Sequence, residues 1–223
     1  MSLHQEAFFA KWSLIIMPTS DLSKRESVKL RRLLFRKSEK EEKEDSSKGK
    51  YKFYVLKMSW DQGIDAIKHF EGIIANDEFL KKVEVRELNP EKDAHDFIIG
   101  YNRAFITAPD PYRSLTLSDV QHFDPKSTFI ASLYGKIIGF IFLTIEPLIK
   151  QGITLGNQGI IAGLGVEHRY RRKKIAFLLA SKAAQYFADH NVLELVCEVY
   201  HENSVSYSFI RNFGMTRTGT IYL

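Results

Sequence analysis

The chain has 223 residues, 44% of them hydrophobic and 26% charged, with a net charge of +5. This is the composition of a folded protein with one large or two small domains. No apolar run approaches the roughly 18 residues of a membrane-spanning helix, and the first residues do not resemble a secretory signal. The single cysteine, Cys197, excludes an internal disulfide framework and a thiolate-rich metal site, so we expect a cytoplasmic protein.

The first third of the chain predicts a small βαβα unit. Its elements are a strand at 11–18, a helix at about 22–35, a flexible charged loop at about 38–50, a strand at 51–60 and a helix from Asp61 to 74. We find no catalytic motif in residues 1–82 and interpret them as an accessory domain.

A second pattern of strands and helices fills residues 83–223 and predicts an α+β domain. Its elements are a strand at 83–88, a helix at 91–105, a short helix capped at Thr116 or Ser118, strands at 127–134, 136–146 and 159–166, a helix at 172–189, a strand at 194–200, a helix at 204–212 capped by Ser204 and ended by Gly214, and a strand at 215–223.

Four consecutive cations stand at the turn between the strand 159–166 and the next helix: Arg171, Arg172, Lys173 and Lys174. The first turn of a helix has unpaired N–H groups and the positive end of the helix dipole, which favour a phosphate. Taken alone, the cluster is more often a solvated basic helix start. The positive balance of the whole chain favours anionic partners, but no nucleic-acid recognition motif accompanies it.

Two blocks resemble the GNAT superfamily of acetyl-CoA-dependent N-acyltransferases. Arg171 and Ala176 match the family's Arg/Gln-x-x-Gly-x-Gly/Ala signature, and the segment from Glu198 to Asn203, with the helix that ends at Gly214, resembles its second block. The resemblance covers about residues 83–223 and implies a mixed central sheet with a splayed strand pair. The spacing between the blocks equals that of the ribosomal-protein alanine N-acetyltransferases.

The resemblance implies acetyl-CoA as co-substrate, without a metal. The backbone of Leu164, Gly165 and Val166 would pair with the pantetheine arm, and Asn203 would bond to it. The amides from Arg172 to Phe177 would hold the pyrophosphate, so the cofactor-binding set also contains Arg171, Lys173, Lys174, Ile175 and Ala176. Lys174 stands where the family has glycine, so its side chain must point away or add its charge to the phosphates.

Two interpretations are open for Gly163 and Gly165 in the strand 159–166. Glycine in a strand indicates a bulge or a close backbone approach, and it is also found where packing is tight. A splayed strand would leave N–H groups unpaired, and one of those from Leu164 to Val166 could serve as an oxyanion donor.

Three residues are candidates for catalysis. The resemblance makes Glu198 the general base, although it could be an exposed strand carboxylate. The family often has a tyrosine seven residues after the asparagine, and here that residue is Ile210. Tyr207 and Tyr200 are the alternative proton donors, and each could be a packing residue. Strand alternation puts Cys197 on the face opposite Glu198, where we expect a small buried hydrophobe.

We therefore expect a GNAT domain at 83–223 that moves an acetyl group from acetyl-CoA to a primary amine by direct attack in a ternary complex. The acceptor would enter near the loop 108–117, where Asp110, Tyr112 and Arg113 are candidate contacts. The rival reading is a catalytically weak or inactive acyl-CoA-binding sensor or interaction module. We expect a monomer or homodimer without membrane association. The family usually has one more strand after the position of residue 223, which here is missing, disordered or supplied by the N-terminal unit.

Overall fold

The computed structural model describes residues 26–34 and 51–222. The predicted strand at 11–18 and the predicted flexible loop at about 38–50 lie outside these residues. Of the predicted first helix, the described part is α2 (Glu26–Leu34).

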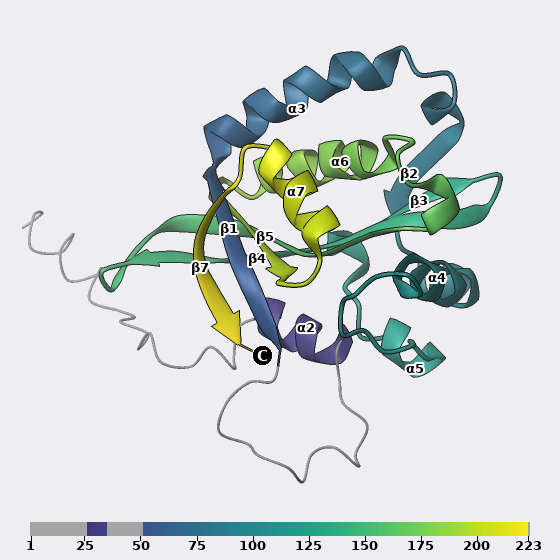
Figure 1. The fold of residues 1–223 in the computed structure, drawn as a ribbon, viewed down its shortest axis with the longest axis horizontal. Coiled ribbons are helices and arrows are strands. Elements are labelled where there is room, and N and C mark those ends of the chain that lie inside the picture. Colours follow the sequence, from purple (N-terminus) through teal and green to yellow (C-terminus); the bar gives the residue numbers. More distant parts are fainter. Residues whose placement is uncertain (1–25, 35–50, 223) are drawn as a thin grey trace, which may run out of the picture.

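In the part of the chain that the structure describes, seven strands form one mixed sheet (Figure 1). In spatial order its strands are β2 (Val83–Glu87), β3 (Thr128–Leu133), β4 (Lys136–Lys150), β5 (Ile153–Val166), β6 (Val192–Tyr200), β1 (Lys52–Ser59) and β7 (Thr216–Tyr222). All neighbouring pairs are antiparallel except β5 and β6, which run parallel. The chain is thus an α+β fold, as the sequence predicts.

Strand β1 lies inside this sheet, between β6 and β7, and pairs with both. Phe53 stands opposite Tyr200 of β6 and Ile221 of β7. The predicted boundary between residues 82 and 83 therefore does not separate two sheets. We expected a strand that pairs with 215–223, and β1 is that strand. Of the three alternatives, the strand is therefore supplied by the N-terminal unit.

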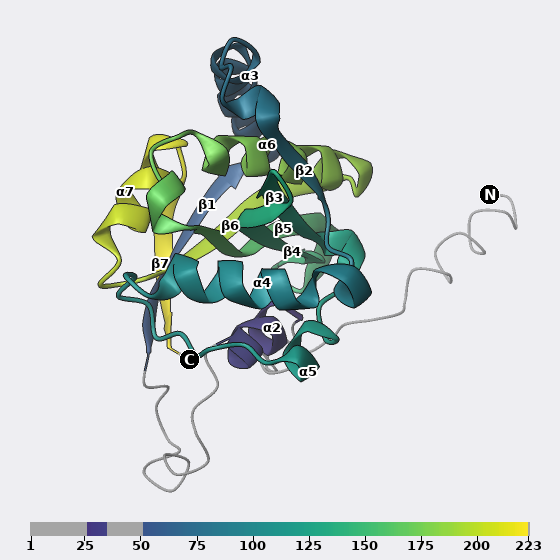
Figure 2. The ribbon, with the colours of Figure 1, turned by 90° about the vertical axis from the view of Figure 1, so that its right-hand side faces the viewer.

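The helices cover the two faces of the sheet (Figures 1 and 2). One face carries α3 (Trp60–Ala75), α6 (Ile175–Asp189) and α7 (Ser204–Asn212), over a core that includes Leu56, Leu179 and Cys197. The other carries α2, α4 (Pro90–Phe105) and α5 (Leu117–Val120), over a second core. Cys197 is 5% exposed, which confirms it as a buried small side chain.

Local signals explain where the helices begin. Ser59 forms a capping box with Gln62 at the start of α3, and Asn89 caps α4, whose first residue is Pro90. The predicted cap of the last helix, Ser204, is wrong by one residue. Asn203 is the cap, because its side-chain oxygen accepts the N–H of Ser206.

Strands β4 and β5 are longer than the sequence predicts. They continue as a paired arm to the turn at Gln151 and Gly152, both of which have positive φ. Leu34 of α2 is buried in the second core, near Gly163.

Candidate active site

The parallel strands β5 and β6 separate halfway along their length. They pair from Asn157 opposite Val192 to Ile161 opposite Cys197, and both continue beyond that point without pairing to each other. On its other edge β5 stays paired with β4, with a bulge that leaves Ala162 as the extra residue. Because a bulge bends its strand and increases the twist, it accounts for the divergence. Residues 162–166 thus have one open edge.

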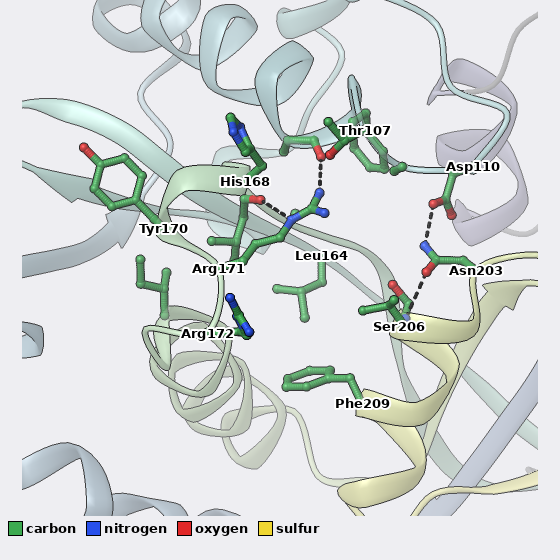
Figure 3. Close-up of a pocket in the computed structure, with 18 of the residues that line it drawn as sticks. Thr107, Asp110, Leu164, His168, Tyr170, Arg171, Arg172, Asn203, Ser206 and Phe209 are labelled. Carbon is green, nitrogen blue, oxygen red and sulfur yellow. Dashed lines mark hydrogen bonds between the residues drawn. The ribbon is translucent and has the colours of Figure 1, made fainter.

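A cavity of about 740 Å³ lies at this open edge. Its walls come from β5, from the turn before α6, from α7 and from the loop after α4 (Figure 3). All predicted cofactor-binding residues except Lys173 line it. They are Leu164, Gly165, Val166, Arg171, Arg172, Lys174, Ile175, Ala176, Phe177 and Asn203.

The turn before α6 contains two residues other than glycine with positive φ. Arg172 and Lys174 have φ of 61° and 62°, and Lys174 precedes the helix without a side-chain cap. The N–H of Phe177 donates to the backbone oxygen of Lys174 at 3.0 Å, which leaves the N–H groups of Ile175 and Ala176 at the start of α6 for a ligand or water. Glycine adopts this φ without strain, which explains why the family signature has glycine at the position of Lys174.

The four cations of the turn have different partners. The Arg171 guanidinium donates to the backbone oxygens of Ala104, at 2.7 Å, and Val166, at 3.2 Å. It therefore joins the turn to the end of α4. Lys173 Nζ lies 4.9 Å from the centre of the Phe79 ring and 5.7 Å from that of Tyr170. Arg172 is exposed and lines the cavity.

The Lys174 side chain reaches Asp77. Its Nζ donates to Asp77 Oδ2 at 3.0 Å, and this contact lowers the pKa of Asp77. Lys174 also lines the cavity, so its side chain lies between the carboxylate of Asp77 and the helix start. The contact with Asp77 could not be read from the sequence, since the two residues are 97 positions apart.

Asn203 and Asp110 meet at the opposite end of the cavity (Figure 3). Asn203 Nδ2 donates to Asp110 Oδ2 at 2.6 Å, while Asn203 Oδ1 accepts from the backbone N–H of Ser206 at 2.9 Å. Burial raises the pKa of Asp110, and the contacts with Asn203 and Arg171 lower it in part.

The predicted catalytic residues do not line the cavity. Glu198 and Tyr200 lie on β6 beyond its last pair with β5, in register with Val55 and Phe53 of β1. The Tyr200 ring contacts Phe53 with 5.5 Å between centroids, and burial raises the pKa of its hydroxyl. Tyr207 packs on Tyr54 with 5.6 Å between ring centroids.

Ile210 and most of the candidate acceptor contacts lie outside the cavity wall. Ile210 is 6% exposed and belongs to the core between the sheet and α6. In the loop, Asp110 lines the cavity, whereas Tyr112 and Arg113 do not. Arg113 forms two hydrogen bonds with Asp119, at 2.8 and 2.7 Å, and one with the backbone oxygen of Leu33.

Sequence reasoning missed several residues of the cavity wall. Thr107, His168, Ser206 and Phe209 line it, and none of them was among the candidate site residues. Within the described ranges, no cluster of three or more His, Cys, Asp or Glu side chains is arranged to hold a metal. No helix of the described chain is both long and apolar enough to span a membrane.

Comparison with known proteins agrees with this geometry. Residues 94–215 match the model of the acetyltransferase (GNAT) family. No curated protein matches the chain.

Solved structures share the fold. One is an aminoglycoside N-acetyltransferase in complex with CoA, 18% identical, with a TM-score of 0.51 over 63% of this chain and 92% of that one. Another is the ribosomal-protein-alanine N-acetyltransferase of Brucella melitensis biovar Abortus 2308, 18% identical, with a TM-score of 0.52 over 63% of this chain and 96% of that one.

Proposed function

The chain belongs to the GNAT family of acetyltransferases, and we propose that it transfers an acetyl group from acetyl-CoA to a primary amine of a protein, peptide or small molecule. The observation that carries the proposal is the open edge of residues 162–166, which faces the same cavity as the start of α6. An unpaired strand edge suits an amide-bearing arm, and an uncapped helix start suits a pyrophosphate.

The cavity residues fit acetyl-CoA in chemistry. Arg172 and the first N–H groups of α6 would hold the phosphates, and the backbone of Leu164 to Val166 would hold the arm. When bound, the co-substrate supplies a thioester carbonyl for attack. A backbone N–H from Leu164 to Val166 would stabilise the negative charge that develops on that carbonyl oxygen.

The amine must lose a proton before it attacks, because a lysine-type ammonium has a pKa near 10. We propose Glu198 as the base, acting directly or through water, since it holds the position of the base in the alanine N-acetyltransferases. We propose Tyr200 or Tyr207 as the proton donor to the departing thiolate. The raised pKa of Tyr200 keeps its hydroxyl protonated at neutral pH, as a donor requires.

Turnover of acetyl-CoA over a panel of amines and peptides, with mass-spectrometric detection of the product, tests this function. Loss of a general base lowers kcat by about a hundredfold or more, so Glu198→Gln is expected to reduce turnover to that degree. The control is Glu71→Gln, which removes an exposed carboxylate on α3. Unchanged turnover in Glu198→Gln contradicts the assignment of the base.

The second candidate function is an acyl-CoA-binding module without efficient turnover. It is favoured by the buried Ile210 in place of the family's tyrosine, and by the absence of Tyr200 and Tyr207 from the residues that line the cavity. Calorimetric binding of acetyl-CoA without turnover on any member of the panel would support this module over the enzyme.

A further inference from the structure

A second, smaller cavity adjoins the first. It has a volume of about 50 Å³ and lies between the sheet and the helices α3, α6 and α7. Leu164 of β5 and Phe209 of α7 line both cavities, and Figure 3 shows them as neighbours in the wall of the first. These two half-buried side chains therefore form the partition between the two spaces.

The aromatic contacts of Phe209 agree with this arrangement. The centroid of its ring lies 5.5 Å from that of Phe177, which lines the first cavity. It lies 5.1 Å from that of Phe213, which lines the second. Phe209 thus packs against one ring from each cavity, and its side chain is the part of the partition that α7 contributes.

The second cavity is apolar. Its described lining consists of aliphatic and aromatic residues, none of them charged, and the indole N–H of Trp60 is the one N–H or O–H group on these side chains. A buried water molecule needs two to four polar partners, so a cavity of this kind stays dry. An apolar group that enters it leaves water and gains packing contacts.

Small residues on two helices leave this space. Ala180, Ala183 and Ala184 line the cavity from α6, and Gly63 lines it from α3. From α7 the cavity is lined by Ile210, at the position where the family often has a tyrosine. An apolar side chain therefore stands in this wall in place of a hydroxyl group.

The volume limits what the second cavity can hold. One water-sized group requires about 10–15 Å³ of space measured in this way. A cavity of about 50 Å³ therefore has room for roughly three such groups, and a methyl or methylene group is of similar size. The cavity suits a short aliphatic chain and is too small for a long one.

We propose that the second cavity receives the acyl chain of the donor, so that the protein transfers propionyl and butyryl groups from their CoA thioesters as well as acetyl groups. The inference rests on the proposed function, because it takes an acyl-CoA held along residues 162–166 as the donor. Leu164 belongs to that segment and to the partition. A longer chain enters the second cavity when the Phe209 side chain turns aside.

The reaction keeps the balance of the acetyl transfer. The amine nitrogen forms its bond to the acyl carbon, and the carbon–sulfur bond of the thioester breaks. The amine loses one proton, and the departing thiolate takes one up. The extra methylene groups take no part in these steps, so their effect is on binding of the donor.

Calorimetry with CoA thioesters, without an acceptor, tests the proposal. The probes are acetyl-CoA, propionyl-CoA, butyryl-CoA and octanoyl-CoA. Burial of one methylene group corresponds to about fourfold in affinity. Butyryl-CoA, which has two more methylenes than acetyl-CoA, is therefore expected to bind about tenfold tighter, and octanoyl-CoA more weakly than butyryl-CoA. Turnover over the amine panel should follow the same order in kcat/KM.

Ala180→Leu fills the second cavity from α6. It is expected to abolish the preference for butyryl-CoA and to leave the affinity for acetyl-CoA unchanged, because the acetyl methyl group does not pass the partition. Ala184→Val, a smaller addition from the same helix, is the second variant if the larger side chain lowers the Tm. The control is Ala188→Leu, the first substitution repeated at an exposed position on α6, which should keep the wild-type preference.

Wild-type protein that binds butyryl-CoA no tighter than acetyl-CoA would overturn the proposal. A preference for butyryl-CoA that persists in both Ala180→Leu and Ala184→Val would also overturn it, since the chain would then lie elsewhere. In both cases acetyl-CoA would still bind and turn over, and the proposed function would stand. If the wild-type protein binds none of the thioesters, the proposed function fails, and the acyl-chain site fails with it.

Discussion

Beyond the arm, strand β5 has a paired half, residues 157–161, and an open half, residues 162–166, and these differ in their neighbouring strands. Residues 157–161 pair with β4 on one edge and with β6 on the other, whereas residues 162–166 pair with β4 alone. The bulge at Ala162 marks the change from one half to the other. One strand therefore belongs to the continuous sheet in its first half and to the wall of a cavity in its second.

The faces of the open half are as closely packed as those of the paired half. A Cβ atom on Gly159 would lie 2.7 Å from the Phe187 ring, and one on Gly165 would lie 2.3 Å from the Phe140 ring. The face that carries Gly165 is therefore closed by Phe140, while the edge of this segment is open. The cavity receives from β5 this backbone edge together with the side chain of Leu164 (Figure 3). Both interpretations of the glycines, bulge and tight packing, apply to this segment.

The largest expected effect comes from Gly165→Ala, because the new methyl group would collide with Phe140. Overpacking of this kind costs about 1–3 kcal/mol, which corresponds to a fall in Tm of several degrees. Gly159→Ala should destabilise the protein similarly, but only Gly165→Ala should also weaken CoA binding. Thermal unfolding and calorimetry measure the two effects.

Gly219 provides the control for this pair, since a Cβ there meets no atom within 4 Å. Gly219→Ala should leave the Tm almost unchanged. If Gly159→Ala weakens CoA binding as much as Gly165→Ala does, the two halves are not functionally distinct.

The loop after α4 is joined to α5 by the ion pair between Arg113 and Asp119. Arg113 holds the pKa of Asp119 well below its ordinary range. A lowered pKa contributes stability that is present above the ordinary carboxylate range and is lost as the pH falls through the lowered value. Asp119→Asn should therefore lower the Tm at pH 7, and the difference from wild type should shrink in strong acid. A Tm difference that is constant from pH 7 into strong acid would contradict this linkage.

The cations of the turn should differ in their effect on CoA affinity. Arg172 lines the cavity, whereas Lys173 lies over the rings of Phe79 and Tyr170. Loss of one charge-assisted contact costs about tenfold in affinity. We expect that loss for Arg172→Ala and a loss of less than about threefold for Lys173→Ala, the two being matched because each removes one charge from the same turn. Equal losses would mean that only the net charge of the turn matters.

The smallest effect is expected for Lys174→Gly. A side chain in the left-handed conformation costs about 1 kcal/mol, so glycine relieves strain while the contact with Asp77 is lost. These changes oppose each other, and the Tm should move by no more than about two degrees. CoA affinity should also stay within about twofold. A tenfold loss of affinity would show that the lysine charge contributes to phosphate binding.

The elements whose signals are local could be predicted from the sequence. The helices α3 and α4 begin close to the expected residues because Ser59 and Asn89 are strong caps. The insertion of β1 between β6 and β7 could not be predicted, since its pairing partners are more than 130 positions away and strand pairing leaves no local signature. The extension of the arm between β4 and β5 was missed because Pro147 and Gly156 interrupt its strand pattern.

The same limit applies to the site. Gly165, Arg171 and Ala176 were candidate site residues because of the resemblance to the family, and all three line the cavity. Side-chain directions depend on distant residues. Lys174 turns toward Asp77, Tyr207 packs on Tyr54, and Asp110 is held by Asn203.

The position of β1 also bears on how the chain folds. Residues 52–59 are synthesised early, but the strands on either side of them, β6 and β7, come last. Contacts between segments so far apart slow folding, because a long loop must close before they form. Until β6 and β7 have been synthesised, β1 cannot pair with either of them. Unpaired strand edges favour aggregation. We therefore expect the chain to be most prone to aggregation before β1 has joined β6 and β7.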